Sequence, residues 1–346
     1  MQGQESVRRV GAISVCLLLL VFALLAACGS AAGSQSVPVD DTGTDPAVAL
    51  PSPASRANHH LPPVWQPLAA RLAADGLDGP AVDALLATLP SEPSQDPMGR
   101  KMRELYRSKF LAQPAHKLPE VRYYKGVVTA SNARLCQDFM TAHPAAFRQA
   151  RRYGVVPQIA VALLFVETRL GRVLGADSKN ALYTLASMAV SRTPESISGW
   201  LDKLPGYEEH TDWLLATMPK RADWAYRETR ALIRHLLQEG GDPRHLPGSV
   251  YGAVGLCQFM PSNISVYGVD GDGDGKVDLF VVDDAVASLS NYLARHGWKP
   301  GLSRSRQQKI LMRYNNSRVY ADTILALADL IRREEQRGSP PKAAKK

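Results

Sequence analysis

Apolar residues occupy every position from Ile159 to Val166, so neither face of this segment is polar. A helix with such a pattern is buried on all sides, whereas a surface helix has one polar face. Glu167 follows directly, and Gly171 is a natural residue for a helix to end at. The pattern therefore predicts a buried helix that starts at Ile159, stops at Gly171 and carries one carboxylate near its end.

Helical periodicity recurs along the rest of the chain, and there is neither an internal repeat nor a sustained strand-like alternation. Residues 117–128 have the pattern of a short extended segment. Further helices are predicted over residues 65–74, 80–89, 132–153 with a break at Pro144, 181–190, 207–218, 221–239, 284–296 and 318–333. We therefore expect a mainly α protein, and residues 61–337 are long enough for one large domain or two smaller ones.

The N-terminus has the pattern of an export signal. Two arginines precede an apolar run from Val10 to Ala27, which ends in LAAC with Cys28. This ending resembles the bacterial lipoprotein signal, which implies that residues 1–27 are removed and that Cys28 carries the lipid. An ordinary signal peptide, or an uncleaved anchor with a chance cysteine, is the alternative. Gly29, where Asp would favour the inner membrane, implies the periplasmic side of the outer membrane.

The segments that flank the folded part have little that could pack. Residues 28–60 are rich in Ala, Gly, Ser, Pro, Asp and Thr and should form a flexible tether. Residues 338–346 should form a disordered basic tail. The net charge of +8 favours an anionic partner, but the charges are scattered. Because an exported lipoprotein rarely meets nucleic acid, the cell wall is the better match.

Two cysteines remain after Cys16 leaves with the signal and Cys28 takes the lipid. Cys136 and Cys257 could form a disulfide in an oxidising compartment, which would stabilise the fold by about 4–5 kcal/mol in the chain-entropy model. Two buried free thiols are the alternative. The spacing of cysteines and histidines does not indicate zinc.

The surroundings of Glu167 suit a general acid. Arg169 and Arg172 do not share its face of the helix, where its neighbours are Leu163, Leu164, Leu170 and Gly171. Desolvation without a local cation raises the pKa of a carboxyl, and a Glu that is protonated at neutral pH can donate a proton. The alternative is a structural Glu that pairs with a distant arginine or a helix end.

Residues 270–284, DGDGDGKVDLFVVDD, have the pattern of a cation-binding loop. The opening of an EF-hand calcium loop is matched by Asp270, Asp272, Asp274 and Gly275. The twelfth position, usually Glu, is Val281, so a longer loop would close on Asp284. Calcium suits this set of oxygen atoms better than magnesium. An acidic, glycine-rich surface turn is the alternative.

Residues 249–262, SVYGAVGLCQFMPS, precede that loop. Gly252 and Gly255 allow a close backbone approach, and Gln258 can both donate and accept hydrogen bonds. Alone, this segment would be a packed loop with a structural glutamine.

Together the motifs VETRLG, ALYTLA, GSVYGAVGLCQFMPS, DGDGDG, NYLARHGW and RYNNSRVYA, in this order, resemble the lytic murein transglycosylase B family. The resemblance covers about residues 61–333 and is dense from Val155 onward. It implies a mainly α fold, with a helical N-terminal part over about 61–150. A lysozyme-like α+β core with an EF-hand-like calcium loop would follow over about 151–337.

The resemblance also implies roles for single residues. Glu167 matches the family's single catalytic acid and base. Contacts with the sugar strand are implied for Ser249 and Gln258, and the cleft lining for Tyr292, Tyr314, Asn315 and Tyr320. Structural calcium would be held by Asp270, Asp272, Asp274, the carbonyl of Lys276, and Asp284. The tyrosines could instead be core residues with hydrogen-bonded hydroxyls. Cys257 stands where the family usually has Gly, and Asp272 where some relatives have Ser.

The implied activity is cleavage of peptidoglycan between N-acetylmuramic acid (MurNAc) and N-acetylglucosamine (GlcNAc). Most glycosidases use two carboxylates, but no acid lies between Asp138 and Asp177 other than Glu167. The family's reaction gives 1,6-anhydroMurNAc ends without hydrolysis. The partners would be glycan strands and, in addition, proteins of wall synthesis or division. A muramidase that hydrolyses the bond, and an inactive calcium-dependent wall-binding lipoprotein, are the two alternatives.

Overall fold

The structure is a computed structural model that describes residues 61–111, 122–175 and 180–338. The expected signal, Cys28, the tether and all but the first residue of the basic tail lie outside the described residues. Among the described helices, none is both long and apolar enough to span a membrane.

The described residues are mainly helical, as the sequence predicts. In chain order the α-helices are α1 (Gln66–Ala74), α2 (Pro80–Leu86), α3 (Asp96–Phe110), α4 (Ala130–Ala142), α5 (Pro144–Arg152), α6 (Pro157–Thr168), α7 (Ala181–Val190), α8 (Ser198–Leu201), α9 (Thr211–Glu239), α10 (Pro261–Tyr267), α11 (Val282–Arg295), α12 (Arg304–Tyr314) and α13 (Arg318–Gly338). Short 3₁₀ turns are η2 (Pro63–Trp65), η3 (Pro194–Ile197), η4 (Tyr207–His210) and η5 (Pro243–His245).

The β part of the expected α+β core does not appear within residues 61–111, 122–175 and 180–338. These ranges hold isolated bridges and no strand; the bridges pair Asn180 with Pro247, Gly248 with Val254, and Val254 with Phe259. The extended segment expected over 117–128 lies partly outside the described residues; of residues 122–128, 125–127 form a turn and none belongs to a strand. The prediction of a strand-like segment is therefore wrong for its described part.

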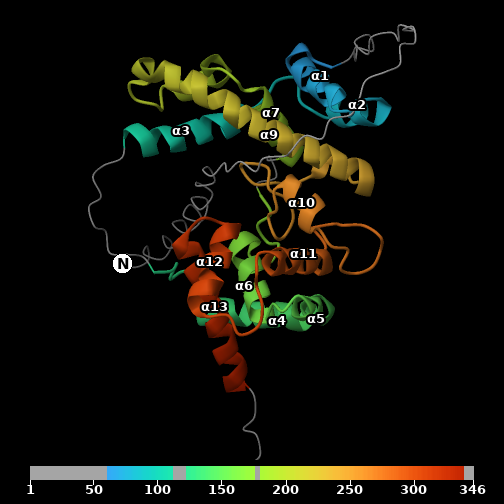
Figure 1. Ribbon diagram of the computed structural model, residues 1–346, viewed down its shortest axis with the longest axis vertical. Helices are drawn as coiled ribbons and strands as arrows, with labels where there is room; N and C mark the ends of the chain where they lie inside the picture. Colours follow the sequence, from blue (N-terminus) through green and yellow to red (C-terminus); the bar gives the residue numbers. More distant parts are fainter. Residues whose placement is uncertain (1–60, 112–121, 176–179, 339–346) are drawn as a thin grey trace, which may run out of the picture.

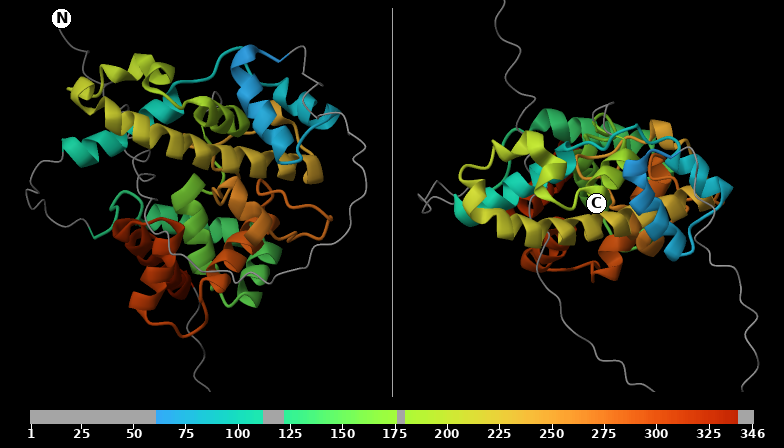
Figure 2. Two further views of the ribbon diagram at one scale, coloured as in Figure 1. Left: turned by 45° about the horizontal axis from the view of Figure 1, so that its top comes forward. Right: turned by 90° about the horizontal axis from the view of Figure 1, so that it is seen from above.

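The helices form two groups (Figure 1). Helices α1, α2, α3, α7 and α9 contact one another and are called the α9 group; α4, α5, α6, α11, α12 and α13 are called the α6 group. Helix α10 contacts both α9 and α11. Figure 1 shows the α9 group above α10 and the α6 group below it, and the left view of Figure 2 keeps this separation.

The chain crosses between the groups more than once, because α4 to α6 follow α3 and α7 returns to the α9 group. The division expected near residue 150 falls inside α5. Since α5 contacts α6 and α11, we propose to place α4 and α5 with the C-terminal helices.

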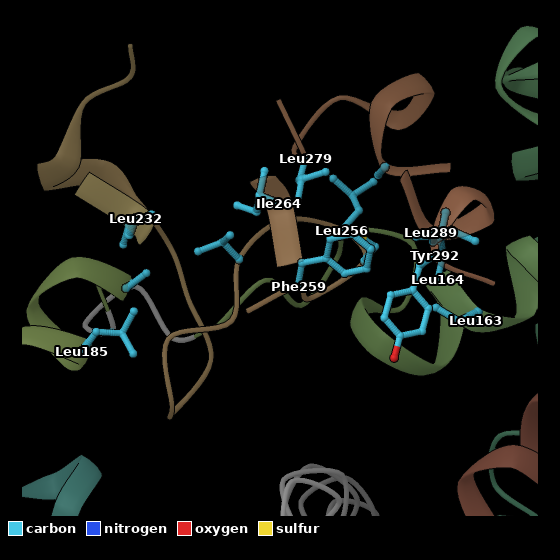
Figure 3. Close-up of a cluster of buried hydrophobic side chains, with 14 of the residues drawn as sticks. Leu163, Leu164, Leu185, Leu232, Leu256, Phe259, Ile264, Leu279, Leu289 and Tyr292 are labelled. Carbon is cyan, nitrogen blue, oxygen red and sulfur yellow. The ribbon is translucent and has the colours of Figure 1, made fainter. Parts of the chain in front are cut away.

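A continuous apolar core joins the two groups (Figure 3). Leu185 and Leu232 lie on the α9 side, and Leu256 and Phe259 of the intervening loop connect them to Leu163 of α6. Each of these side chains is at most 5% exposed. Burial of a large apolar side chain stabilises a fold by about 1.5–3 kcal/mol, so this junction holds the groups together.

Helix α6 is buried from Ile159 to Phe165, as predicted, but it ends at Thr168, three residues before Gly171. Arg169 and Leu170 have left-handed φ angles of 50° and 62°. Such angles are uncommon outside glycine and indicate local constraint. A long-range hydrogen bond holds the chain at this point: the buried hydroxyl of Thr168 donates to the carbonyl oxygen of Leu256 at 2.9 Å.

Helix α9 runs through Pro219, although two separate helices were predicted over 207–218 and 221–239. A proline inside a helix costs about 3 kcal/mol. The buried stripe of α9 nevertheless continues on both sides of Pro219, through Leu214, Met218, Ala222 and Ala225. Packing of this stripe, including that against α7, therefore outweighs the local preference for a break.

Cys136 and Cys257 are both buried and both free. Of the two states that the sequence left open, the structure has the free thiols. Burial raises the pKa of Cys136 to about 12, so this thiol stays protonated.

Candidate active site

Glu167 lies in the last turn of α6, and the hydroxyl of Tyr320 on α13 donates a hydrogen bond to its Oε1. Glu167 is neither fully buried nor exposed, whereas Tyr320 is 1% exposed. Burial raises the pKa of Glu167 to about 7, and the hydrogen bond from Tyr320 offsets only part of this rise. The site therefore holds a carboxyl that can exchange a proton at neutral pH.

The loop over residues 249–260 passes directly beside the end of α6. Leu256 accepts the hydrogen bond of Thr168, and its N–H donates to the carbonyl of Leu279 at 2.8 Å. Gly255, at φ 74°, lies so close to Leu279 that an added Cβ would meet the Leu279 Cβ at 2.3 Å. Glycine is therefore required there, because any side chain would push the loop away from Leu279.

Tyr314, at the end of α12, ties the same loop to the α6 group. Its hydroxyl donates to the carbonyl of Cys257 at 2.5 Å. The negative charge of Glu167 contributes to raising the pKa of both Tyr314 and Cys257, so all three groups are close neighbours. Burial is the larger cause for both, and each keeps its proton at neutral pH.

Tyr292 lies behind Tyr314 and does not reach Glu167 through any hydrogen bond described here. Its ring packs against Tyr314 with centroids 4.9 Å apart, and its hydroxyl donates to the carbonyl of Arg313 at 2.8 Å. It also stacks on His296 at 4.1 Å. The structure thus brings Tyr320 and Tyr314 to Glu167, whereas Tyr292 supports Tyr314 from the core.

Ser249 and Gln258 both lie in the loop and both have internal partners. The Ser249 hydroxyl accepts from the N–H groups of Tyr251 and Ala253 at 3.2 and 3.0 Å. Gln258 has a left-handed φ of 51°, is 9% exposed, and donates from Nε2 to the carbonyl of Gly255 at 2.8 Å. These bonds fix the shape of the loop.

Asn315 follows α12 and is partly buried. Its N–H donates to the carbonyl of Leu311 at 3.2 Å, and its own carbonyl accepts from Ser317 at 2.6 Å. It directly follows Tyr314, so it lies at the same end of α12.

The acidic loop between α10 and α11 brings three of the five predicted metal ligands together. Asp270, Asp272 and Asp284 each offer a carboxylate oxygen within 4.8 Å of the others. Asp274 is not part of this cluster; its Oδ1 accepts from the N–H of Lys276 at 2.8 Å. Three carboxylate oxygens are the donors that calcium prefers, so the residues fit such an ion.

Asp284 is the buried member of the cluster, at 1% exposed. It accepts from the N–H groups of Gly271 and Asp278 at 2.8 and 2.6 Å. Burial and the charge of Asp272 raise the pKa of Asp284, and those hydrogen bonds lower it. On balance the pKa of Asp284 is raised, which means that its charged form is disfavoured. A bound cation would stabilise that charged form.

Thr168 is a site residue that the sequence interpretation did not single out. Its buried hydroxyl bridges Leu256 and the N–H of Gly171, at 2.9 and 3.0 Å. A polar residue directly after Glu167 in an apolar helix was the available signal, because a buried hydroxyl needs a partner.

Comparison with known proteins identifies the family. The family model described as the transglycosylase SLT domain matches residues 61–310. Membrane-bound lytic murein transglycosylase B of Escherichia coli (strain K12) is 32% identical over 182 residues, which span 52% of this chain and 43% of that protein. The matched part is thus less than half of that relative.

Solved structures of lytic transglycosylases share the fold. Soluble lytic transglycosylase SltB1 from Pseudomonas aeruginosa superposes with a TM-score of 0.59 at 22% identity, covering 80% of this chain and all of that one. Escherichia coli Slt35 in complex with bulgecin A has a TM-score of 0.59 at 23% identity, covering 80% and 94%. Slt35 in complex with calcium has a TM-score of 0.56, with the same identity and coverage.

The order of the sequence motifs, the helical fold and the extent of the family match agree with one another. The chain therefore belongs to the lytic murein transglycosylase B family, and residues 61–310 match its transglycosylase SLT domain.

Proposed function

We propose that this protein is a peptidoglycan lytic transglycosylase that cleaves the β-1,4 bond between MurNAc and GlcNAc without consuming water. The observation that carries the proposal is Glu167, a partly buried carboxyl whose pKa is raised to about 7 in the family's acid motif. About half of such groups are protonated at neutral pH, which suits a residue that must first give and then take a proton.

The first step breaks the glycosidic bond. Protonated Glu167 gives its proton to the glycosidic oxygen, and GlcNAc leaves with a hydroxyl at that position. The N-acetyl carbonyl oxygen of MurNAc bonds to the anomeric carbon as the bond breaks. Because Tyr320 donates to Oε1, the proton of Glu167 is carried by Oε2, which is the oxygen that would face the sugar.

The second step closes the ring. The Glu167 carboxylate takes the proton of the MurNAc 6-hydroxyl, whose oxygen displaces the acetamido oxygen at the anomeric carbon. The product is a 1,6-anhydroMurNAc end, and Glu167 is again protonated. One carboxyl thus replaces the pair that hydrolytic glycosidases use.

The neighbours of Glu167 would position the substrate. Ser249 and Gln258 would contact the sugar strand from the loop, and Tyr314 and Asn315 would stabilise developing charge. Tyr320 and, behind Tyr314, Tyr292 would line the site. The support is that Tyr314 and Tyr320 lie close to Glu167 and that the loop is bonded to the end of α6.

We also propose that calcium binds the acidic loop as a structural ion, held by Asp270, Asp272, Asp274, the carbonyl of Lys276, and Asp284. The cluster of Asp270, Asp272 and Asp284 supports this, and the loop contacts distant helices. Gln149 of α5 donates to the carbonyl of Gly271 at 3.1 Å, and Glu239 of α9 accepts from the N–H of Val277 at 3.2 Å. An ion there would fix both helix groups to one loop.

Calcium should therefore raise the melting temperature of the protein. At 100 times its Kd an ion adds about 2.7 kcal/mol, which is a rise of about 4–8 °C for a domain of this size. Asp284→Asn should abolish this rise, whereas Asp242→Asn, on a surface aspartate outside the loop, should keep it. Thermal unfolding with calcium and with a chelator measures both. An equal rise in Asp284→Asn would contradict the site.

We further propose that Cys28 is lipidated and that the protein faces the periplasm from the outer membrane, with wall synthesis or division proteins as partners. The LAAC signal supports this, and the Escherichia coli relative is described as membrane-bound.

Digestion of purified sacculi, followed by mass spectrometry of the fragments, tests the proposed reaction. We expect fragments lighter by one water than hydrolysis would give. Fragments with the mass of hydrolysis products would identify a muramidase instead. Binding to sacculi without any released fragment would identify an inactive wall-binding protein.

A further inference from the structure

Helix α3 of the α9 group reaches the 249–260 loop through one buried tyrosine. The hydroxyl of Tyr251, which is 5% exposed, donates to Oε1 of Glu104 at 2.5 Å. The other oxygen of Glu104 accepts from the ammonium group of Lys101 at 2.8 Å. That ammonium group also lies 4.0 Å from the centre of the Tyr251 ring. We call these three residues the α3 clamp.

The α3 clamp holds the opposite end of the loop from Glu167. At one end, Leu256 and Cys257 are bonded to Thr168 and Tyr314 of the α6 group. At the other end, the N–H of Tyr251 donates to the hydroxyl of Ser249. The loop therefore spans the two helix groups, and each group fixes one end of it.

The bonds of the α3 clamp are of the strong kinds. A hydrogen bond to a carboxylate is stronger than one between neutral groups. A cation over an aromatic ring contributes a second attraction, which is larger when water is excluded. Burial keeps the pKa of Tyr251 raised, so its hydroxyl stays a donor. Removing that hydroxyl would leave α3 and the loop joined by packing and by the contact of Lys101 with the ring, without a hydrogen bond from the Tyr251 side chain.

The clamp also lies beside open surface. A depression of about 90 Å³ separates the start of α3 from α7 and the loop, and its lining includes Asp96, Arg100, Tyr183 and Val250. Val250 lies between Ser249 and Tyr251 in the chain. A ligand in this depression would therefore contact both the loop, at Val250, and the first turns of α3.

We propose that Tyr251 and Glu104 are positioning residues, which hold the loop so that Ser249 and Gln258 meet the sugar strand while Glu167 acts on it. Helix α3 is then one wall of the strand-binding site, although it lies far from α6 in the sequence. This inference rests on the proposed function for its effect on cleavage. Its effect on loop order is independent of that function.

The chain contains a matched control. Tyr226 of α9 is 4% exposed, donates to Asp75 at 2.6 Å, and has the guanidinium of Arg71 3.8 Å from its ring centre. Asp75 also pairs with Arg230 at 2.6 Å. This second tyrosine–carboxylate–cation set joins α1 to α9 and makes none of the loop's hydrogen bonds described above. Tyr226→Phe thus removes the same kind of bond as Tyr251→Phe.

The test compares both variants on sacculi and by amide hydrogen exchange. Tyr251→Phe should lower kcat/KM about tenfold, the loss expected for one charged hydrogen bond, mainly through KM. It should also speed exchange over residues 249–258. Tyr226→Phe should stay within about twofold of wild type in kcat/KM, although both variants melt at lower temperature. Equal kcat/KM in the two variants, or unchanged exchange in Tyr251→Phe, would overturn the proposal.

Glu104→Gln is the second variant and keeps the test valid if Tyr251→Phe folds poorly. It keeps an acceptor for the Tyr251 hydroxyl but loses the negative charge that strengthens this hydrogen bond and that Lys101 holds in place, so kcat/KM should fall by only about threefold. Adding it to Tyr251→Phe should cause little further loss, because both act on one contact. Full additivity of the two losses would overturn the coupling. A failure of the proposed function would look different: wild type itself would release no anhydro fragments, while the exchange result would stand.

Discussion

Replacing Glu167 with glutamine should lower the rate of strand cleavage about 10³-fold or more, because one residue is both general acid and general base. Glutamine is close in shape and can still accept the hydrogen bond from Tyr320, so the site should keep its geometry. Binding of sacculi should therefore remain near that of wild type. Release of fragments and sedimentation of bound protein measure the two properties separately.

Glu228→Gln is the matched control for that experiment. Glu228 lies on α9, is 5% exposed, and its pKa is raised by burial, as for Glu167. It accepts from the N–H and the hydroxyl of Ser262, both at 2.9 Å, and so joins α9 to α10. Its loss should affect stability more than the rate. If Glu167→Gln kept more than about a tenth of wild-type activity, the acid would have to be another residue.

The raised pKa of Glu167 should make the folded protein less stable as pH rises. The ordinary pKa of a glutamate is 4.5, and that of folded Glu167 is about 7. Between these values the folded state binds a proton that the unfolded state releases, so the free energy of unfolding falls with rising pH. The loss is complete by about pH 8 and amounts to about 3 kcal/mol.

Glu167→Gln should remove this loss. The difference in unfolding free energy between the variant and wild type should be constant below pH 4.5 and should grow in favour of the variant up to about pH 8. Other groups with raised pKa, including Glu228 and Asp284, are common to both proteins and cancel. Denaturant titrations at pH 4.5, 6 and 8 measure the difference. A difference independent of pH would mean that Glu167 is not held in its protonated form.

The sequence was most informative where composition alone decides the structure. An apolar run without a polar face has to be buried, so the environment of Glu167 could be predicted from Ile159–Val166. The end of α6 could not, because it depends on Thr168 finding Leu256, a residue 88 positions away. Long-range partners of this kind leave no local pattern.

Helices α3 and α12 were missed for a related reason. Both have narrow buried stripes: α3 buries Met98, Met102 and Tyr106 in an otherwise charged segment, and α12 buries Ile310 and Leu311. Charged side chains on the other faces hide such a stripe. The same omission hid the contact between Glu104 and Tyr251, because α3 was not expected to be a helix at all.

The sequence predicted some parts of the candidate site and not others. The acidic loop could be recognised from its spacing, and the structure gathers Asp270, Asp272 and Asp284 but not Asp274. Where each tyrosine lies depended on packing between α11, α12 and α13, which periodicity does not give. Tyr320 therefore contacts Glu167, whereas Tyr292 supports it only through Tyr314.

Digestion of sacculi in water enriched in heavy oxygen tests the central claim most directly, which is that Glu167 serves twice and that no water enters the product. The new MurNAc ends released by wild type should carry no heavy oxygen and should have the anhydro mass, and Glu167→Gln should release none. One heavy oxygen at each new end would show that water attacks the anomeric carbon, and would contradict this account.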